Sequence, residues 1–242
     1  MLVVGLTGGI ATGKSTVSKS LKEKHGLTIV DADLIAREVV YPGKSAYNKI
    51  IDTFGHEIPD LVKDDKSLNR EALGKHVFGD KENLGKLNRI VHPAVKQEIA
   101  WQIIKAYFTF KHLVILDVPL LYESGLYMIC GKTVTVTCDK DIQIKRLLAR
   151  NPELTPEDAD KRIDSQMSDD ERCYRSDYII SNNHGLGELE QNIIHIIREV
   201  SPNMIFTVLD WFPPFGILSG FLTLTVRYLV ERFKGTCPPK RQ

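Results

Sequence analysis

Residues 1–21 read MLVVGLTGGIATGKSTVSKSL, and residues 8–15 have the spacing G-x-x-x-x-G-K-[ST] of a phosphate-binding loop. The apolar run at 2–6 predicts a buried strand before the loop, and Val17 and Leu21 are spaced as on one face of an amphipathic helix after it. Strand, glycine-rich loop and helix therefore occur in the order that the motif requires. The alternative is a glycine-rich turn with an incidental lysine, and both flanks disfavour it.

Each part of this loop has a predicted contact with a bound phosphate. In such loops the backbone N–H groups point inward, and the N-terminus of the following helix adds partial positive charge. The Lys14 ammonium would reach the β- and γ-phosphates, and the Ser15 hydroxyl would bind Mg²⁺. The predicted nucleotide-binding residues are Gly8, Gly9, Ile10, Ala11, Thr12, Gly13, Lys14, Ser15 and Thr16.

Composition indicates a globular protein and excludes few functions. A length of 242 residues fits one domain, or one domain with insertions. The 32 basic and 31 acidic residues give a net charge of +1, which does not indicate a nucleic-acid partner. The four cysteines show no C-x-x-C pair and no metal-ligand spacing, so free thiols in a reducing compartment are expected. No leader is expected, because the first strand begins at Leu2.

Strand and helix patterns alternate along most of the chain. Helices are predicted at about 139–150 and at 189–200. Another helix is predicted to begin after the N-cap Thr155, with Pro156 at its first position. This alternation predicts an α/β fold with a mainly parallel sheet. Residues 44–110 instead read as a helical insertion. The further strands are predicted at 28–30, 113–116, 133–137 and 178–180, and the breaks within the insertion at Gly55, Pro59, Gly79 and Pro93.

Acidic residues follow two of the predicted strands. Asp31, Asp33 and Asp117 lie at carboxyl ends of strands, where ligands bind in parallel α/β sheets. Two carboxylates two residues apart would point to opposite sides if the strand continued. An alcohol acceptor needs a group that receives its proton, and Asp33 is the candidate for that general base. The alternative is that Asp31 or Asp33 caps the next helix.

Arginines recur at helical spacing in the second half of the chain. Arg146 and Arg150 lie four residues apart on one predicted helix, and Arg162 and Gln166 repeat the spacing on the next. Phosphoryl transfer needs cations over the developing charge, and a helical lid is a usual way to bring them. The alternative is a solvated basic face.

The sequence resembles the dephospho-CoA kinase family in stretches that occur in the family's order from residue 2 to about 200. The DAD-x-I-A-R and PLL-x-E-S segments separate this family from other P-loop kinases. The matching stretches are GLTGGIATGKST at 5–16, VDADLIAREVVYPG at 30–43, LNRIVHP at 87–93, DVPLLYESGLY at 117–127, and RIDSQM through SDYIISNN at 162–183.

The resemblance implies ATP-dependent phosphorylation of the ribose 3′-hydroxyl of dephospho-CoA, with Mg²⁺-ATP as donor and CoA as product. It also implies a P-loop kinase fold, with a five-stranded parallel sheet flanked by helices, within residues 1–203. A helical CoA-binding insertion is implied near 35–110 and a lid near 140–175.

By position, the resemblance assigns Asp33 as general base and Arg146 as the lid arginine over the transferring phosphate. With Lys14 of the phosphate loop, these are the predicted catalytic residues. It implies that Asp33, His92 and Arg150 bind dephospho-CoA. His92 has an alternative role, because a histidine before a proline can simply end a helix.

Asp117 sits where many P-loop proteins hold a ligand of Mg²⁺, and the sequence leaves its role open. A kinase for another nucleotide or small alcohol remains the nearest rival reading, and a nucleotide-binding scaffold is a rival from another class. A GTPase is disfavoured because the chain has no N-K-x-D motif. Other enzymes of CoA synthesis are candidate partners.

Residues 204–242 lie beyond the resemblance to the bacterial pattern. Residues 211–226 carry no charge, but as a helix they span about 24 Å against a bilayer core of about 30 Å. The Pro213-Pro214 pair is predicted to break a helix, and basic residues outnumber acidic ones after Val226. We expect a cytoplasmic enzyme whose tail contacts the cytosolic face of an organelle membrane, either the mitochondrial outer membrane or the endoplasmic reticulum. The alternative is an apolar tail packed on the kinase core.

Overall fold

The computed structural model describes residues 1–234, in two compact units. One unit contains residues 31–105, and the other contains residues 1–30 together with the chain from Ala106 onward. Each unit is described by itself. Cys237 and the predicted basic residues Lys240 and Arg241 lie outside the described residues.

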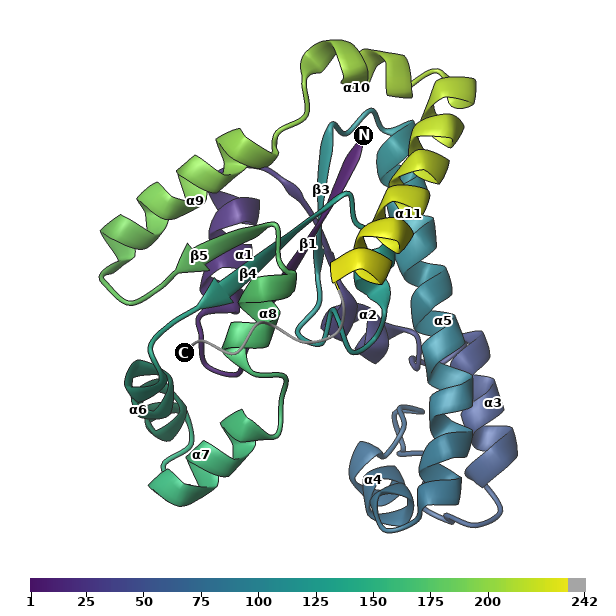
Figure 1. Cartoon of the computed structure of the whole chain (residues 1–242). Helices are drawn as coiled ribbons and strands as arrows, with labels where there is room; N and C mark the ends of the chain where they lie inside the picture. The colour runs from purple at the N-terminus through teal and green to yellow at the C-terminus, as the bar shows by residue number, and fades with distance from the viewer. Residues whose placement is uncertain (235–242) are drawn as a thin grey trace. The chain divides into compact units, whose positions relative to one another are not determined.

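Five strands form one sheet at the centre of the larger unit (Figure 1). They are β1 (Leu2–Gly8), β2 (Thr28–Asp31), β3 (Leu113–Asp117), β4 (Lys132–Thr137) and β5 (Tyr178–Ser181), in the order β2-β3-β1-β4-β5. The pairs β1–β3, β1–β4 and β4–β5 are parallel. Every residue of β3 is buried, as expected for a strand covered on both faces. The predicted five-stranded sheet is confirmed.

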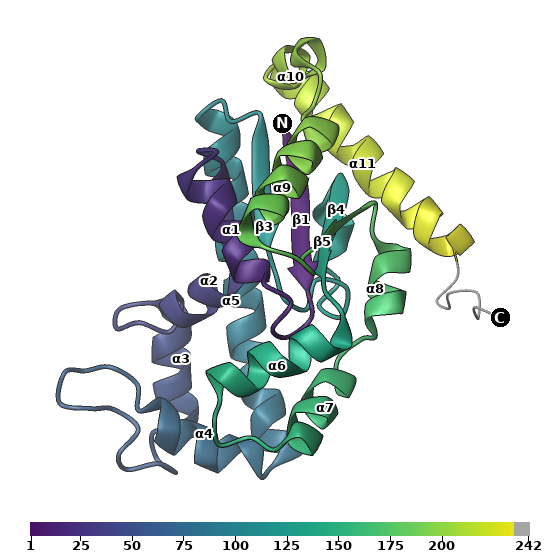
Figure 2. The same cartoon turned by 90° about the vertical axis from the view of Figure 1, so that its left-hand side faces the viewer.

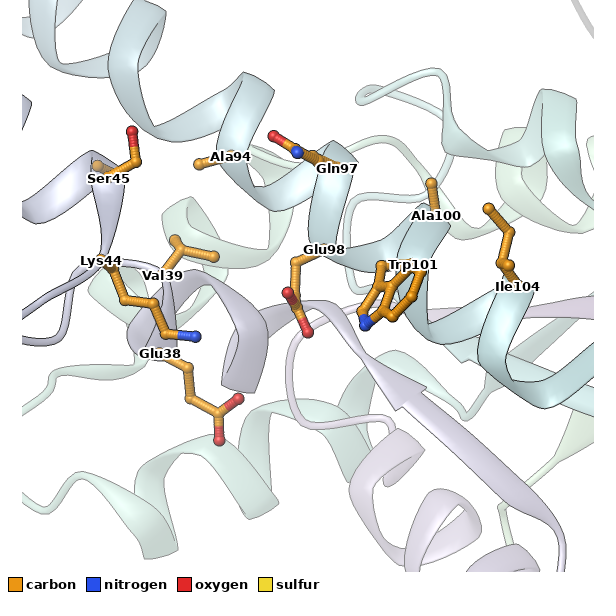
Figure 3. A pocket seen from close by; sticks show the side chains of 11 residues that line it. Glu38, Val39, Lys44, Ser45, Ala94, Gln97, Glu98, Ala100, Trp101 and Ile104 are labelled. Atoms are coloured by element: carbon orange, nitrogen blue, oxygen red, sulfur yellow. The ribbon is translucent and has the colours of Figure 1, made fainter. Parts of the chain in front are cut away.

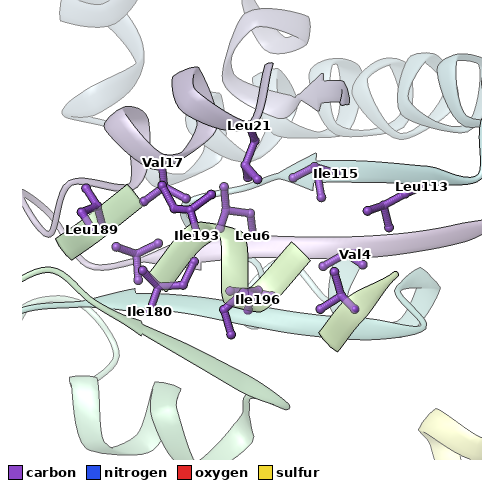
Figure 4. Close-up of a cluster of buried hydrophobic side chains, with 13 residues drawn as sticks. Val4, Leu6, Val17, Leu21, Leu113, Ile115, Ile180, Leu189, Ile193 and Ile196 are labelled. Carbon is purple, nitrogen blue, oxygen red and sulfur yellow. The ribbon is translucent and has the colours of Figure 1, made fainter. Parts of the chain in front are cut away.

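Helices α1 (Lys14–Glu23) and α9 (Leu186–Val200) lie side by side on one face of the sheet (Figure 2). Val17 and Leu21 of α1 are buried there, as their spacing predicted, and Ile193 of α9 packs in the same cluster. Figure 4 shows these side chains meeting those of the central strands. This packing fixes the start of α1 directly after β1, which is where the phosphate loop lies.

Three helices connect β4 to β5. They are α6 (Lys140–Arg150), α7 (Pro156–Asp164) and α8 (Asp169–Arg175), and a short 3₁₀ helix, η1 (Leu126–Ile129), precedes β4. The Thr155 hydroxyl accepts a hydrogen bond from the Asp158 N–H at 3.2 Å, so the predicted cap of α7 is confirmed. The prediction that Gln166 shares a helix with Arg162 is wrong. Helix α7 ends at Asp164, and the Ser168 side chain already caps α8 by accepting from the Glu171 N–H.

The smaller unit is helical and contains α2 (Ala32–Glu38), α3 (Ser45–Phe54), α4 (Arg70–Phe78) and most of α5 (Lys81–Phe108). Gly55 and Gly79 end helices as predicted. The predicted break at Pro93 is wrong, because Pro93 lies inside α5. An interior proline costs about 3 kcal/mol. Burial on both sides of it offsets that cost, since Ile90 packs on the unit's core and Ile99 is buried.

The tail forms α10 (Met204–Asp210) and α11 (Pro213–Lys234). The Pro213-Pro214 pair separates these helices, as predicted, but it also begins α11, because proline is tolerated in a first helical turn. Within residues 1–234, none of the helices combines the length and the hydropathy of a membrane-spanning segment. This agrees with the length estimate for residues 211–226.

Candidate active site

The loop between β1 and α1 is tightly folded. The Thr12 hydroxyl donates to the Gly9 carbonyl at 2.9 Å, and the Thr12 N–H reaches the same carbonyl at 3.3 Å. Ala11 and Gly13 both have positive φ, 59° and 95°. These bonds bend the chain into a compact turn at the N-terminus of α1, where backbone N–H groups and the helix dipole favour an anion.

Asn182 holds the far side of this turn. It follows the last residue of β5, is 6% exposed, and donates from Nδ2 to the Thr12 carbonyl at 2.8 Å. A Cβ on Gly13 would lie 2.1 Å from that nitrogen, so glycine is required there by both space and backbone conformation. Sequence reasoning did not assign Asn182 a role. The available signal was a polar amide immediately after a predicted strand.

Arg146 on α6 also reaches the loop. It donates from Nη2 to the Asn182 carbonyl at 3.1 Å and from Nη1 to the Thr12 carbonyl at 3.4 Å. The structure therefore places a guanidinium beside the predicted phosphate site. Arg150 is exposed at the last residue of α6. Burial raises the pKa of the neighbouring Cys138 thiol, and Arg146 opposes that rise.

Lys14 forms an ion pair with a buried carboxylate. Its Nζ lies 2.5 Å from Asp117 Oδ1, and Asp117 is 3% exposed. The pair forms because β1 and β3 are neighbours and Asp117 is in register with Leu6, two residues before the loop. Ser15 and Thr16 are exposed in the first turn of α1. Charge, backbone donors and a hydroxyl thus meet at one helix terminus.

In the smaller unit, the two candidate aspartates have different positions. Asp31 caps α2 by accepting from the Leu34 N–H at 2.9 Å, so the capping alternative holds for Asp31. Asp33 is exposed in the first turn of α2. The expectation of two carboxylates on opposite sides of a strand is wrong, because the strand ends at Asp31 and the helix begins at Ala32. Asp33 is therefore not the cap.

A cavity of about 500 Å³ lies within the helical unit (Figure 3). Trp101 and Ile104 of α5 form an apolar wall, and Lys44 and Glu98 are among its charged lining residues. His92 is exposed on the same helix but does not line the cavity. It also does not end a helix, because α5 continues to Phe108.

A second cavity, of about 450 Å³, lies in the larger unit between the phosphate loop and the helices that follow β4. Gly9, Gln143, Gln166 and Arg172 are among the residues that line it. Arg172 is 1% exposed and pairs with Asp169 at 2.5 Å. These side chains bring the predicted lid against the loop.

Comparison with known proteins agrees with this geometry. The family model for dephospho-CoA kinase matches residues 2–188. The dephospho-CoA kinase of Saccharomyces cerevisiae is 50% identical over 238 residues, which cover 97% of each chain. The dephospho-CoA kinase of Oceanobacillus iheyensis is 43% identical over 198 residues, 82% of this chain and 97% of its own. The match to the yeast protein covers 97% of this chain and therefore includes most of the tail.

The fold leads to the same family. The solved structure of dephospho-CoA kinase from Campylobacter jejuni matches with a TM-score of 0.64 and 29% identity, covering 82% of this chain and 96% of its own. The resemblance inferred from the motifs is thus confirmed. The chain belongs to the dephospho-CoA kinase family.

Proposed function

We propose that the phosphate loop, Asp33 and the helices after β4 carry out the family's reaction in named roles. The reaction is transfer of the γ-phosphoryl group of ATP to dephospho-CoA, giving CoA and ADP. The observation that carries the proposal is the meeting of Lys14, Arg146 and the loop backbone at the start of α1. Such an arrangement binds the triphosphate and stabilises the charge that develops during transfer.

Lys14 and Arg146 have complementary parts in this proposal. The Lys14 ammonium, oriented by Asp117, neutralises the β- and γ-phosphate oxygens. Arg146 reaches the loop from α6 through hydrogen bonds to the Thr12 and Asn182 backbone carbonyls, and its guanidinium turns from these carbonyls to the transferring phosphoryl group. Arg150 and His92 remain proposed acceptor contacts, and both side chains are exposed.

Asp33 is the proposed general base. The acceptor is a ribose 3′-hydroxyl, whose proton must leave as the oxygen bonds to phosphorus. Asp31 is committed to the Leu34 N–H as the cap of α2, and the family pattern in the DAD segment assigns the base to Asp33. The proton thus passes from the 3′-oxygen to a carboxylate oxygen of Asp33.

The residues at the loop fit Mg²⁺. The Ser15 hydroxyl is exposed beside Lys14, and Asp117 supplies a carboxylate in the same place. The described residues contain no group of three His, Cys, Asp or Glu side chains that could hold a metal. Mg²⁺ needs no such group, because it binds through one or two protein oxygens plus phosphates and waters. When bound, it would neutralise phosphate charge, with Ser15 as the proposed ligand.

The cavity in the helical unit is the proposed site for the part of dephospho-CoA that does not react (Figure 3). Its apolar wall at Trp101 suits the pantetheine arm, and its polar lining suits the arm's amides. Trp101→Ala is expected to raise KM for dephospho-CoA with kcat little changed. An unchanged KM would separate the cavity from the acceptor site.

The kinase for another nucleotide or small alcohol is the rival that an experiment must exclude. It shares the phosphate loop but not the family match over residues 2–188. A coupled assay with dephospho-CoA, adenosine and AMP as acceptors distinguishes the two directly. Dephospho-CoA is expected to be phosphorylated far faster than the other acceptors.

We also propose that the tail holds the protein against a cytosolic membrane surface. One side of the tail packs on the rest of the larger unit. The Met1 amino group lies 2.9 Å from the Asp210 carboxylate, and Arg227 donates to the carbonyls of Cys130 and Gly131 and pairs with Asp177. The alternative of a packed tail thus describes this side.

The other side of the tail is apolar and exposed. Ile217 is 74% exposed and Phe221 is 69% exposed. So much apolar surface on one helix favours an interfacial position along a bilayer, and not a span across it. After Arg227 the sequence contains four basic residues and one acidic residue, a charge balance that favours anionic lipids. The exposed apolar residues of this face are Phe212, Phe215, Ile217, Leu218, Phe221, Leu222, Leu224, Val226 and Leu229.

A further inference from the structure

Both backbone polar groups of Ile10 are bound by glutamine side chains that lie far away in the sequence. The Ile10 carbonyl accepts from Gln143 Nε2 at 2.6 Å, and the Ile10 N–H donates to Gln166 Oε1 at 3.0 Å. Gln143 is 3% exposed on α6, and Gln166 lies between α7 and α8. Two parts of the predicted lid thus form hydrogen bonds to the same residue of the phosphate loop.

The phosphate loop packs closely against the predicted lid beside these two hydrogen bonds. A Cβ on Gly9 would lie 3.0 Å from Gln143 Nε2 and 3.1 Å from both Arg172 Nη1 and Asp169 Oδ1. A side chain at this position would require these three groups to move by a few tenths of an ångström. Ala11, directly after Ile10, holds a φ of 59°, which is uncommon for a residue with a side chain. External hydrogen bonds to Ile10 stabilise such a conformation.

The segment between α7 and α8 that contains Gln166 is held by hydrogen bonds of its own. Arg172 Nη2 donates to the Met167 carbonyl at 2.9 Å, and its Nη1 binds Asp169 at 2.5 Å. Asp169 also accepts from the Thr137 hydroxyl at 3.2 Å, which ties the turn to the end of β4. The buried arginine therefore fixes the segment that carries Gln166.

We propose that Gln143 and Gln166 are positioning residues that set the conformation of the phosphate loop through the two polar groups of Ile10. They couple the lid to ATP binding without touching the reacting atoms. This inference rests on the proposed binding of the ATP phosphates by the loop. The two contacts have opposite chemistry, because the Ile10 N–H needs an acceptor and the Ile10 carbonyl needs a donor.

Substitutions that preserve the size of the glutamine side chain test whether Ile10 needs these hydrogen bonds. Gln166→Glu keeps an acceptor oxygen and is expected to keep KM for ATP within about twofold of wild type. Gln166→Met and Gln143→Met remove the contacts and are expected to raise KM for ATP about tenfold, the cost of one buried hydrogen bond. KM for dephospho-CoA is expected to stay unchanged. Gln191→Glu, at an exposed position on α9, is the control for the substitution itself.

A second measurement makes the inference independent of catalysis. Hydrogen exchange in the peptide that contains Ile10 is expected to accelerate in Gln166→Met and to stay slow in Gln166→Glu. Wild-type ATP kinetics together with unchanged exchange in both methionine variants would overturn the inference. If Lys14→Ala left KM for ATP unchanged, the proposed phosphate site would be wrong, yet the exchange result would still report the contact with Ile10.

Discussion

The Lys14 ammonium lies 2.5 Å from the Asp117 carboxylate, between the first turn of α1 and the end of β3. Because Asp117 is buried, the pair is shielded from solvent and the position of Lys14 is fixed. Asp117 thereby has a physical role that its place in the sequence left open.

Asp117→Asn is expected to lower kcat with dephospho-CoA about 10–100-fold, since the lysine loses the charge that orients it. The measurement is steady-state kinetics at several Mg²⁺ concentrations. A loss that excess Mg²⁺ restores would assign Asp117 to the metal, whereas a loss independent of Mg²⁺ would assign it to Lys14. Wild-type kinetics would show that the pair is catalytically silent.

Lys14→Ala and Asp33→Asn are expected to separate ATP binding from turnover. Lys14→Ala should bind ATP more weakly and turn over more slowly, because the positive charge that faces the β- and γ-phosphates is lost. Asp33→Asn should bind ATP normally and lose about 10²–10⁴-fold in kcat, which is the usual contribution of a positioned proton acceptor. Calorimetric ATP binding and kcat for each variant check this, and near-normal turnover in Asp33→Asn would remove the base assignment.

Glu190 joins α1 to α9 and gives stability a pH dependence. Hydrogen bonds from Lys24, His25 and Ser20 lower the pKa of its carboxyl to about 2. Because the pKa of Glu190 in the folded state lies below its ordinary value of 4.5, the ionised carboxylate stabilises the fold fully above pH 4.5. This contribution is lost as the pH falls toward 2.

Glu190→Gln is therefore expected to destabilise the protein by about 1 kcal/mol at neutral pH, with a smaller difference at pH 3. Urea unfolding at the two pH values measures it. Glu188→Gln on the same helix, whose carboxylate lies 3.6 Å from His184 near the surface, is the matched control. Equal differences at both pH values would contradict the assignment of the low pKa.

The tail proposal predicts that charge on its outer face releases the protein from membranes. Phe221→Glu with Leu222→Glu leaves the contacts of Arg227 in place and is expected to abolish co-sedimentation with anionic vesicles while kcat stays within about twofold of wild type. Leu186→Glu, at an equally exposed apolar residue on α9, is the control. Wild-type protein that stays in the supernatant would refute the membrane role.

The elements that local pattern specifies could be predicted from the sequence. The five strands are short apolar or β-branched runs bounded by turn residues, and the phosphate loop has its own spacing. The side chains that complete the site act through long-range contacts. Asn182 and Gln143 bind loop carbonyls 170 and 133 residues away, and no periodicity encodes such a pairing. The break predicted at Pro93 does not occur, because burial on both sides of the proline outweighs its local helix-breaking preference.

The choice of acceptor distinguishes this enzyme from other P-loop kinases. Purified protein with Mg²⁺-ATP, presented separately with dephospho-CoA, adenosine and AMP, allows turnover of each to be compared under one set of conditions. We expect kcat/KM for dephospho-CoA to exceed that for either other acceptor by orders of magnitude, with CoA as the product. Equal or faster phosphorylation of adenosine or AMP would contradict it.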